Sequence, residues 1–183
     1  MHRRSVIFAL AVLAILAIVG IFTVLRNGSR RETVTTNQPA SKSSNPESVN
    51  PLRGDIYPAA TNATNDVSNA LAQAAREHKR VILDFGGNWC GDCRVLDFYF
   101  HDAANLPLLN ANYVLVRVNI GEYDHNQDLA AKYGIPLEKG VPALAVLTPD
   151  GEVLFSQHNG EFEGMRSMDS ASVTEFLTKW KAG

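Results

Sequence analysis

Cys90 and Cys93, the two cysteines of this 183-residue chain, are separated by two residues in the segment Trp89–Cys93. The segment directly follows an apolar run, Val81–Phe85, which is typical of a buried strand. Two thiols with this spacing, at a position where a strand is followed by a helix, can form a disulfide within one helical turn and be reduced again. The backbone N–H groups and the dipole of the helix stabilise the attacking thiolate there. Because the chain has no other cysteine, the pair is either a redox centre or half of a metal site.

The remaining residues favour redox chemistry over metal binding. A structural zinc ion takes four ligands, and no second cysteine or histidine pair stands at a suitable spacing. We therefore expect no metal and no cofactor other than the redox-active disulfide itself. Cys90, at the exposed start of the helix, is the expected nucleophile, and Cys93, one turn deeper, is expected to resolve the mixed disulfide. The alternatives are a copper- or zinc-handling thiol protein and an adaptor that binds one partner through residues 158–168.

Asp84 lies within the predicted buried strand, six positions before Cys90. A carboxylate is costly to bury, and burial raises its pKa towards a range useful for proton transfer. Two interpretations follow. Asp84 is either a proton acceptor for Cys93 or an acid satisfied by local hydrogen bonds or a water.

Gly91 and Asp92, the residues between the cysteines, are candidates for tuning the redox potential. A negative charge in the first helical turn complements the helix dipole, but beside Cys90 it opposes the thiolate and raises the pKa of the thiol. A less stabilised thiolate makes a weaker oxidant. Asp92 therefore predicts a protein that donates electrons, unless it serves only to start the helix.

The hydrophobic pattern predicts helices and strands that alternate along the chain. The predicted helices are Val67–His78 capped by Asn65 or Asp66, Cys90 to about His101, a turn from Pro107, Gln127–Tyr133, and a last helix capped by Asp169 or Ser170 and running to Trp180; the predicted strands are Val81–Phe85, Tyr113–Ile120, Ala143–Leu147 and Val153–Ser156. Strands that alternate with helices run parallel, and the terminal hairpin adds antiparallel strands. We therefore expect an α/β fold with a mixed four-stranded sheet covered by helices on both faces.

Over residues 65–182 the sequence resembles the thioredoxin superfamily. The residues that carry the resemblance are Leu83-Asp84-Phe85, Trp89 directly before Cys90, Arg117–Ile120, Tyr133–Ile135, Gly140-Val141-Pro142 and the turn Asp150-Gly151. The resemblance implies a thioredoxin-like fold and a disulfide oxidoreductase. It also favours the interpretation of Asp84 as the proton acceptor.

The resemblance further implies how a client binds. The peptide bond between Val141 and Pro142 is expected to be cis, exposing the Val141 backbone beside Cys90 so that an extended client strand can pair there. Trp89 is expected to pack beside the site and shape the contact surface. The chain departs from the family at Gly91-Asp92, where the commonest pair is Gly-Pro, in an insertion at 136–139 and in a longer loop at 158–168. The identity of the client therefore does not transfer.

The N-terminal part of the sequence predicts a membrane anchor. Val6–Leu25 is apolar except for Gly20 and Thr23, and a helix of that length spans a hydrocarbon core of roughly 30 Å. A cleaved signal peptide is the alternative, but its apolar region would be shorter. We expect an uncleaved anchor over 1–25, a polar tether over 26–54 and a thioredoxin-like domain over 55–183.

Localisation and partners follow from this organisation. Long domains translocate largely regardless of their charge, so the domain is expected on the periplasmic or extracellular side of the cytoplasmic membrane. The expected partners are disulfide-bearing client proteins, a membrane electron donor and, through the anchor, the membrane. The net charge of −2 gives no basis for nucleic-acid binding. The expected activity is disulfide reduction, with an oxidase or isomerase as the alternative of the same fold.

Overall fold

The computed structural model describes residues 54–60 and 62–183. Its helices and strands, with two short 3-10 helices marked η, are α2 (Ala63–Glu77), β1 (Arg80–Gly86), α3 (Gly91–Phe100), α4 (Asn105–Asn112), β2 (Tyr113–Asn119), α5 (Gln127–Lys132), η1 (Leu137–Lys139), β3 (Ala143–Leu147), β4 (Val153–Ser156), η2 (Met165–Ser167) and α6 (Ser170–Trp180). The predicted anchor and nearly all of the predicted tether lie outside the described residues. Within the described ranges, no helix is long and apolar enough to cross a membrane.

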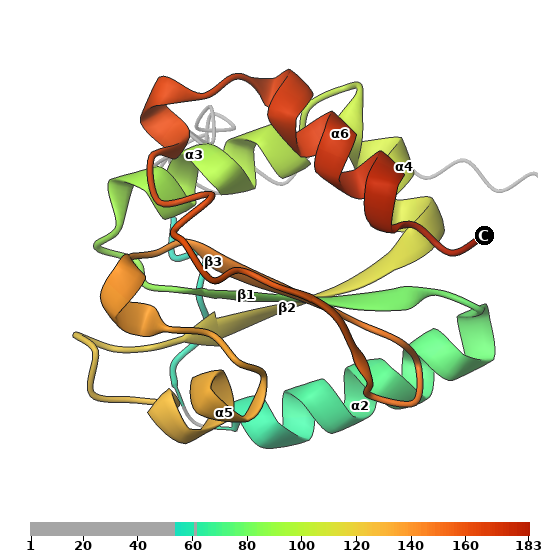
Figure 1. Ribbon diagram of the computed structural model, residues 1–183, viewed down its shortest axis with the longest axis horizontal. Helices are drawn as coiled ribbons and strands as arrows, with labels where there is room; N and C mark the ends of the chain where they lie inside the picture. Colours follow the sequence, from blue (N-terminus) through green and yellow to red (C-terminus); the bar gives the residue numbers. More distant parts are fainter. Residues whose placement is uncertain (1–53, 61) are drawn as a thin grey trace, which may run out of the picture. The chain divides into compact units, whose positions relative to one another are not determined.

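The four strands form one mixed sheet in the order β2-β1-β3-β4 (Figure 1). β1 and β2 are parallel, whereas β3 is antiparallel to both β1 and β4. The hairpin between β3 and β4 turns at Gly151, which has a φ of +86° that glycine adopts at no steric cost. The Gly151 N–H donates to the Thr148 carbonyl oxygen at 3.0 Å. The predicted α/β class and mixed four-stranded sheet are confirmed.

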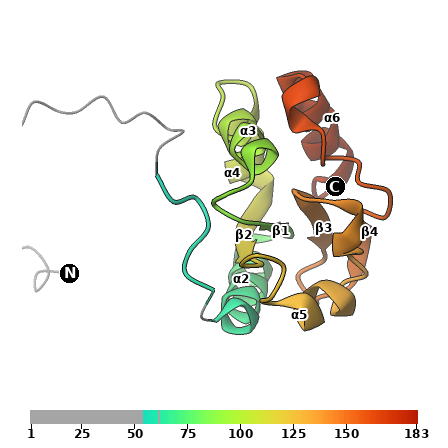
Figure 2. The same ribbon diagram turned by 90° about the vertical axis from the view of Figure 1, so that its left-hand side faces the viewer.

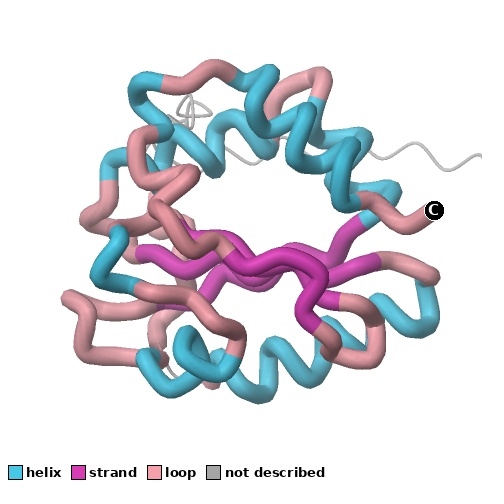
Figure 3. Tube along the Cα trace, in the orientation of Figure 1, coloured by secondary structure: helices cyan, strands magenta, loops and turns pink. Residues whose placement is uncertain are grey.

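Helices cover both faces of the sheet, as predicted. α2 and α5 lie on one face, and α3, α4 and α6 lie on the other (Figures 1 and 3). The same layers are visible in the side view of Figure 2. Leu83 and Phe85 of β1 pack in the core that includes α2, and Ile82 packs in the core that includes α6. Because side chains alternate along a strand, Asp84 shares the face of Ile82, on the side of α3.

The first described helix begins earlier than the sequence pattern predicted. Its N-cap is Asn62, whose carbonyl oxygen accepts the N–H groups of Asn65 and Asp66 at 2.9 and 3.0 Å. The predicted cap at Asn65 or Asp66 is therefore wrong. The additional turn forms because Ala63 and Val67, four residues apart, both bury their side chains in the core. At the other end of the chain, the predicted cap of α6 is confirmed, since the Asp169 side chain accepts the N–H of Ser172 at 3.1 Å.

Candidate active site

Cys90 is the N-cap of α3 and forms a disulfide with Cys93, one turn further along the helix. The Cys93 N–H donates to Cys90 Sγ at 3.1 Å. The same N–H is placed to stabilise a Cys90 thiolate once the disulfide is reduced. Cys93 is fully buried and Cys90 is 5% exposed. Cys90 is thus the more accessible of the two, although it is more covered than the exposed position that we expected.

The loop before β3 covers Cys90. The Val141–Pro142 peptide bond is cis, and the Val141 carbonyl oxygen lies 3.5 Å from Cys90 Sγ. Buried Gln157 holds this loop from the end of β4, since its Nε2 donates to the Pro142 carbonyl oxygen at 3.1 Å and its Oε1 accepts the N–H of Leu144 at 3.2 Å. The Val141 carbonyl oxygen therefore lies against the more accessible of the two sulfurs.

Asp84 of β1 is buried and accepts a hydrogen bond from the Tyr57 hydroxyl at 2.9 Å. Burial raises the pKa of Asp84 to about 7, although the Tyr57 hydrogen bond and the positive charge of Arg117 each lower it. A carboxyl with a pKa near neutrality can exchange a proton under physiological conditions. Arg117 itself pairs with Asp97 of α3 rather than with Asp84.

Gly86, the last residue of β1, allows these groups to meet. A Cβ at this position would stand 2.4 Å from the Tyr57 hydroxyl oxygen and 2.8 Å from Cys93 Sγ. Both neighbours are buried, so neither can move aside freely. The close approach of Tyr57 and Cys93 therefore requires glycine at position 86.

Replacement of Gly86 by alanine is expected to destabilise the fold by about 1–3 kcal/mol, because the added methyl group overpacks a filled core. Urea unfolding of the oxidised chain in mild detergent measures this effect. The matched control is Gly164→Ala, since a Cβ at position 164 would meet nothing within 4 Å. Equal stability of the two variants would contradict the close packing at Gly86.

Asp92 is paired with Arg166 of η2. Its carboxylate accepts hydrogen bonds from the Arg166 backbone N–H at 2.8 Å and from Arg166 Nε at 3.0 Å. Burial alone would raise the pKa of Asp92, but these bonds from Arg166 outweigh it and lower the pKa below its usual value. Asp92 therefore stays ionised, and Arg166 offsets part of the charge that the sequence alone assigns to the neighbourhood of Cys90. Arg166 also lies over Gly91, where an added Cβ would be 3.6 Å from its Nη1 atom.

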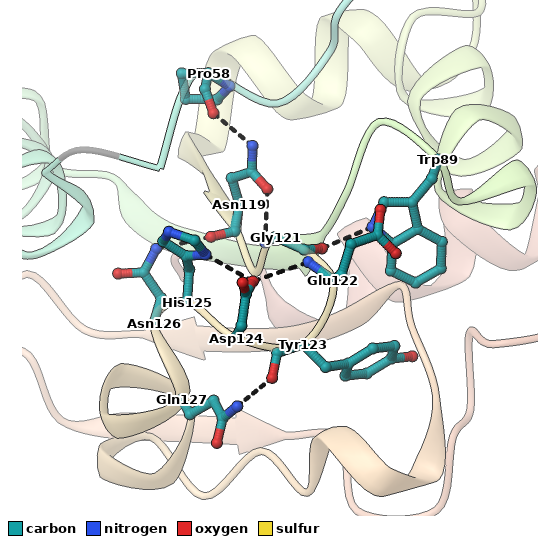
Figure 4. Close-up of polar contacts among 10 residues, drawn as sticks. All are labelled: Pro58, Trp89, Asn119, Gly121, Glu122, Tyr123, Asp124, His125, Asn126 and Gln127. Atoms are coloured by element: carbon teal, nitrogen blue, oxygen red, sulfur yellow. Dashed lines mark hydrogen bonds and ion pairs between the residues drawn. The ribbon is translucent and has the colours of Figure 1, made fainter.

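Trp89 is 46% exposed and is fixed by the loop that follows β2 (Figure 4). Its Nε1 donates to the Gly121 carbonyl oxygen at 2.6 Å, and its ring lies 5.5 Å from that of Tyr123. Tyr123, 39% exposed, has a φ of +67°, in the left-handed region that costs energy for a residue with a side chain. Trp89, the residue directly before Cys90, thus forms an exposed aromatic pair with Tyr123.

The structure brings the predicted site residues together at the carboxyl end of β1. Three further residues of the site were missed by the sequence analysis, namely Tyr57, Gln157 and Arg166. None of them belongs to a periodic pattern or lies close to the cysteines in the sequence, and each reaches the site only through the tertiary fold. The catalytic, docking and tuning roles of the predicted residues remain predictions. In residues 54–60 and 62–183, no three His, Cys, Asp or Glu side chains gather as metal ligands do.

Comparisons with known proteins point to one family. A family model described as thioredoxin-like matches residues 62–149. A protein disulfide-isomerase of Ricinus communis is 30% identical over 120 residues, which are 65% of this chain and 20% of that protein. A thioredoxin of Mus musculus is 30% identical over 106 residues, which are 57% of this chain and 87% of that protein.

A solved structure gives the same result. The crystal structure of a disulphide isomerase from Xylella fastidiosa Temecula1 is 34% identical, with a TM-score of 0.66, and the match covers 69% of this chain and 97% of that one. The chain thus spans about a fifth of the plant isomerase but nearly the whole of the Xylella protein.

Proposed function

Because the chain belongs to the thioredoxin-like superfamily and carries the dithiol of a protein-disulfide oxidoreductase, we propose that it reduces disulfide bonds of proteins outside the cytoplasm. The observation that carries the proposal is the Cys90–Cys93 disulfide at the start of α3, with Cys90 Sγ 3.5 Å from the carbonyl oxygen that precedes the cis proline.

The reaction runs in two exchanges. The Cys90 thiolate attacks one sulfur of the client disulfide, and the other client sulfur leaves as a thiolate that takes a proton from solvent. Cys93 then gives its proton to Asp84 and attacks the Cys90 sulfur, which releases the second client thiolate. The Cys90–Cys93 disulfide forms as two electrons pass to the client. A thiol or dithiol donor must then restore the reduced form.

Docking of the client uses the surface around Cys90. An extended client segment pairs with the backbone at Val141, beside the attacking sulfur. Trp89 and Tyr123 add an exposed aromatic surface on the adjacent loop. Backbone pairing does not select a sequence, and this suits a protein that acts on several clients.

The proposed direction of electron flow depends on Asp92. Its ionised carboxylate opposes the negative charge of a Cys90 thiolate in the same helical turn. The guanidinium of Arg166 offsets this only in part, because its side chain is 70% exposed and screened by water. A thiolate that is less stabilised favours the disulfide form of the protein, and therefore reduction of the client.

The proposed location follows from the sequence that precedes the domain. The apolar run Val6–Leu25 would anchor the chain in the cytoplasmic membrane, and residues 26–54 would tether the domain on the periplasmic or extracellular side. An electron donor within the same membrane would lie within reach of a domain held in this way.

A second candidate activity is disulfide isomerisation, which the names of the Ricinus and Xylella relatives favour. An isomerase uses the same first exchange, but the client resolves the mixed disulfide by itself.

The two activities separate in a single experiment with the full chain in mild detergent. The reduced chain is mixed with insulin and, separately, with a ribonuclease whose disulfides have been scrambled. The proposal predicts that each chain reduces one insulin disulfide. It also predicts that the chain restores no more ribonuclease activity than an equal amount of dithiothreitol does in a control reaction. Recovery of ribonuclease activity without net reduction of insulin would establish the isomerase instead.

A further inference from the structure

Tyr57 comes from the segment that precedes α2, yet its side chain lies at the buried side of the dithiol. It is 1% exposed, and its hydroxyl donates to Asp84 Oδ1 at 2.9 Å. The hydroxyl oxygen and Cys93 Sγ both lie within 3 Å of the point where a Gly86 Cβ would stand, at 2.4 and 2.8 Å. The phenol thus contacts the carboxylate and lies beside the resolving sulfur.

Two asparagine side chains hold the segment that carries Tyr57 in place. Asn88, two residues before Cys90, accepts the N–H groups of Ile56 and Tyr57 on its Oδ1, each at 2.9 Å. The Asn88 Nδ2 donates in return to the Tyr57 carbonyl oxygen at 2.9 Å. Asn119, at the end of β2, donates to the Pro58 carbonyl oxygen at 2.8 Å (Figure 4). The segment is therefore fixed to the loop that leads into Cys90 and to the end of β2.

The other charged groups that face Asp84 come from two elements. Arg117 of β2 stands opposite Asp84 in the strand register, and its charge lowers the pKa of the carboxyl. Asp97 of α3 pairs with Arg117 and raises that pKa, so it offsets part of the effect of the arginine charge. The hydrogen bond from Tyr57 lowers the pKa of Asp84 more than the positive charge of Arg117 does.

We propose that Tyr57 is a positioning residue of the dithiol site, whose hydroxyl orients the Asp84 carboxylate and stabilises the ionised form that takes the proton of Cys93. The inference rests on the proposed function, because it concerns the second exchange of the same reaction. In that step the Cys93 thiol passes its proton to Asp84, directly or through one water. The resulting thiolate displaces the client sulfur from Cys90, and Tyr57 keeps its own proton throughout.

The test follows the rate at which the reduced full chain, in mild detergent, is oxidised by glutathione disulfide between pH 5 and pH 9, using tryptophan fluorescence. Glutathione disulfide is held at concentrations where the rate no longer depends on its amount, so that the second exchange limits the rate. In Tyr57→Phe the carboxylate loses a hydrogen bond, so the midpoint of the rate profile is expected to move up by about one pH unit. The rate at pH 7 is then expected to fall about fivefold, because fewer molecules hold an ionised Asp84. A fluorinated phenol is a stronger donor, so 3-fluorotyrosine at position 57 is expected to move the midpoint down.

Two controls separate positioning from loss of structure. Tyr113→Phe removes another buried hydroxyl, which donates to the Leu177 carbonyl oxygen at 2.7 Å from the start of β2, and it is expected to leave the profile unchanged. In an Asp84→Asn background, Tyr57→Phe is expected to cause no further shift. An unshifted midpoint in both position-57 variants, or a shift that persists without Asp84, would overturn the inference. A wild-type chain that does not reduce insulin would instead refute the proposed function.

Discussion

Replacement of Cys90 by serine is expected to abolish reduction of insulin by the chain, a loss of at least about a thousandfold, because the nucleophile of the first exchange is removed. Cys93→Ser has a different consequence. Its Cys90 thiolate can still attack, but the buried sulfur that should release the client is absent. We expect this variant to accumulate a covalent mixed disulfide between Cys90 and the client.

Non-reducing electrophoresis followed by mass spectrometry measures the trapped species. Each variant is the control for the other, since both replace one sulfur by oxygen within the same helical turn. Trapping by Cys90→Ser rather than by Cys93→Ser would contradict the assignment of nucleophile and resolving residue. Trapping by neither would remove the support for dithiol exchange.

Replacement of Asp84 by asparagine is expected to slow the second exchange by at least about a hundredfold, because the amide cannot accept the Cys93 proton. The same change is expected to stabilise the folded protein at alkaline pH. In the unfolded chain the carboxyl has its usual value of 3.8, whereas burial raises the folded pKa to about 7. Between these values the folded state binds more protons, so stability falls as pH rises, and the full cost of Asp84 is present above pH 7.

The shift of about three pH units corresponds to roughly 4 kcal/mol at its upper limit. Asp84→Asn is therefore expected to raise the free energy of unfolding by about 2–4 kcal/mol at pH 8 and by little at pH 4. Urea unfolding of the oxidised chain at the two pH values measures the difference. Asp128→Asn, on the exposed face of α5, is the control and is expected to change stability by less than about 0.5 kcal/mol at either pH. An equal effect at pH 4 and pH 8 would show that Asp84 does not titrate in this range.

The elements that carry the site could be predicted from the sequence because their signals are local. Val81–Phe85 is apolar and directly precedes the cysteines, and the pattern of β3 and β4 is interrupted by the turn at Asp150-Gly151. The start of α2 was misplaced because Asn65 and Asp66 are good capping residues in their own right. The helix begins at Ala63, whose side chain is buried in the core. The sequence around this alanine does not indicate that it is buried.

The electrostatics of the site could not be predicted in the same way. Asp92 lies two residues after Cys90 in the sequence, but its partner Arg166 is 74 residues away from it. Tyr57 lies 27 residues before Asp84, in a segment without helical or strand periodicity. Such contacts depend on the tertiary fold, so the sequence predicts the reacting sulfurs better than the groups that tune them.

The equilibrium redox potential of the Cys90–Cys93 pair is the most direct test of the proposed reductase. The full chain in mild detergent is titrated against dithiothreitol and against glutathione, and the fraction of disulfide is read from alkylated and unalkylated protein. We predict a potential near or below roughly −230 mV, from which the dithiol gives electrons to most exposed protein disulfides. A potential near roughly −120 mV, at the strongly oxidising end of the scale, would contradict the proposal and assign the dithiol to disulfide formation.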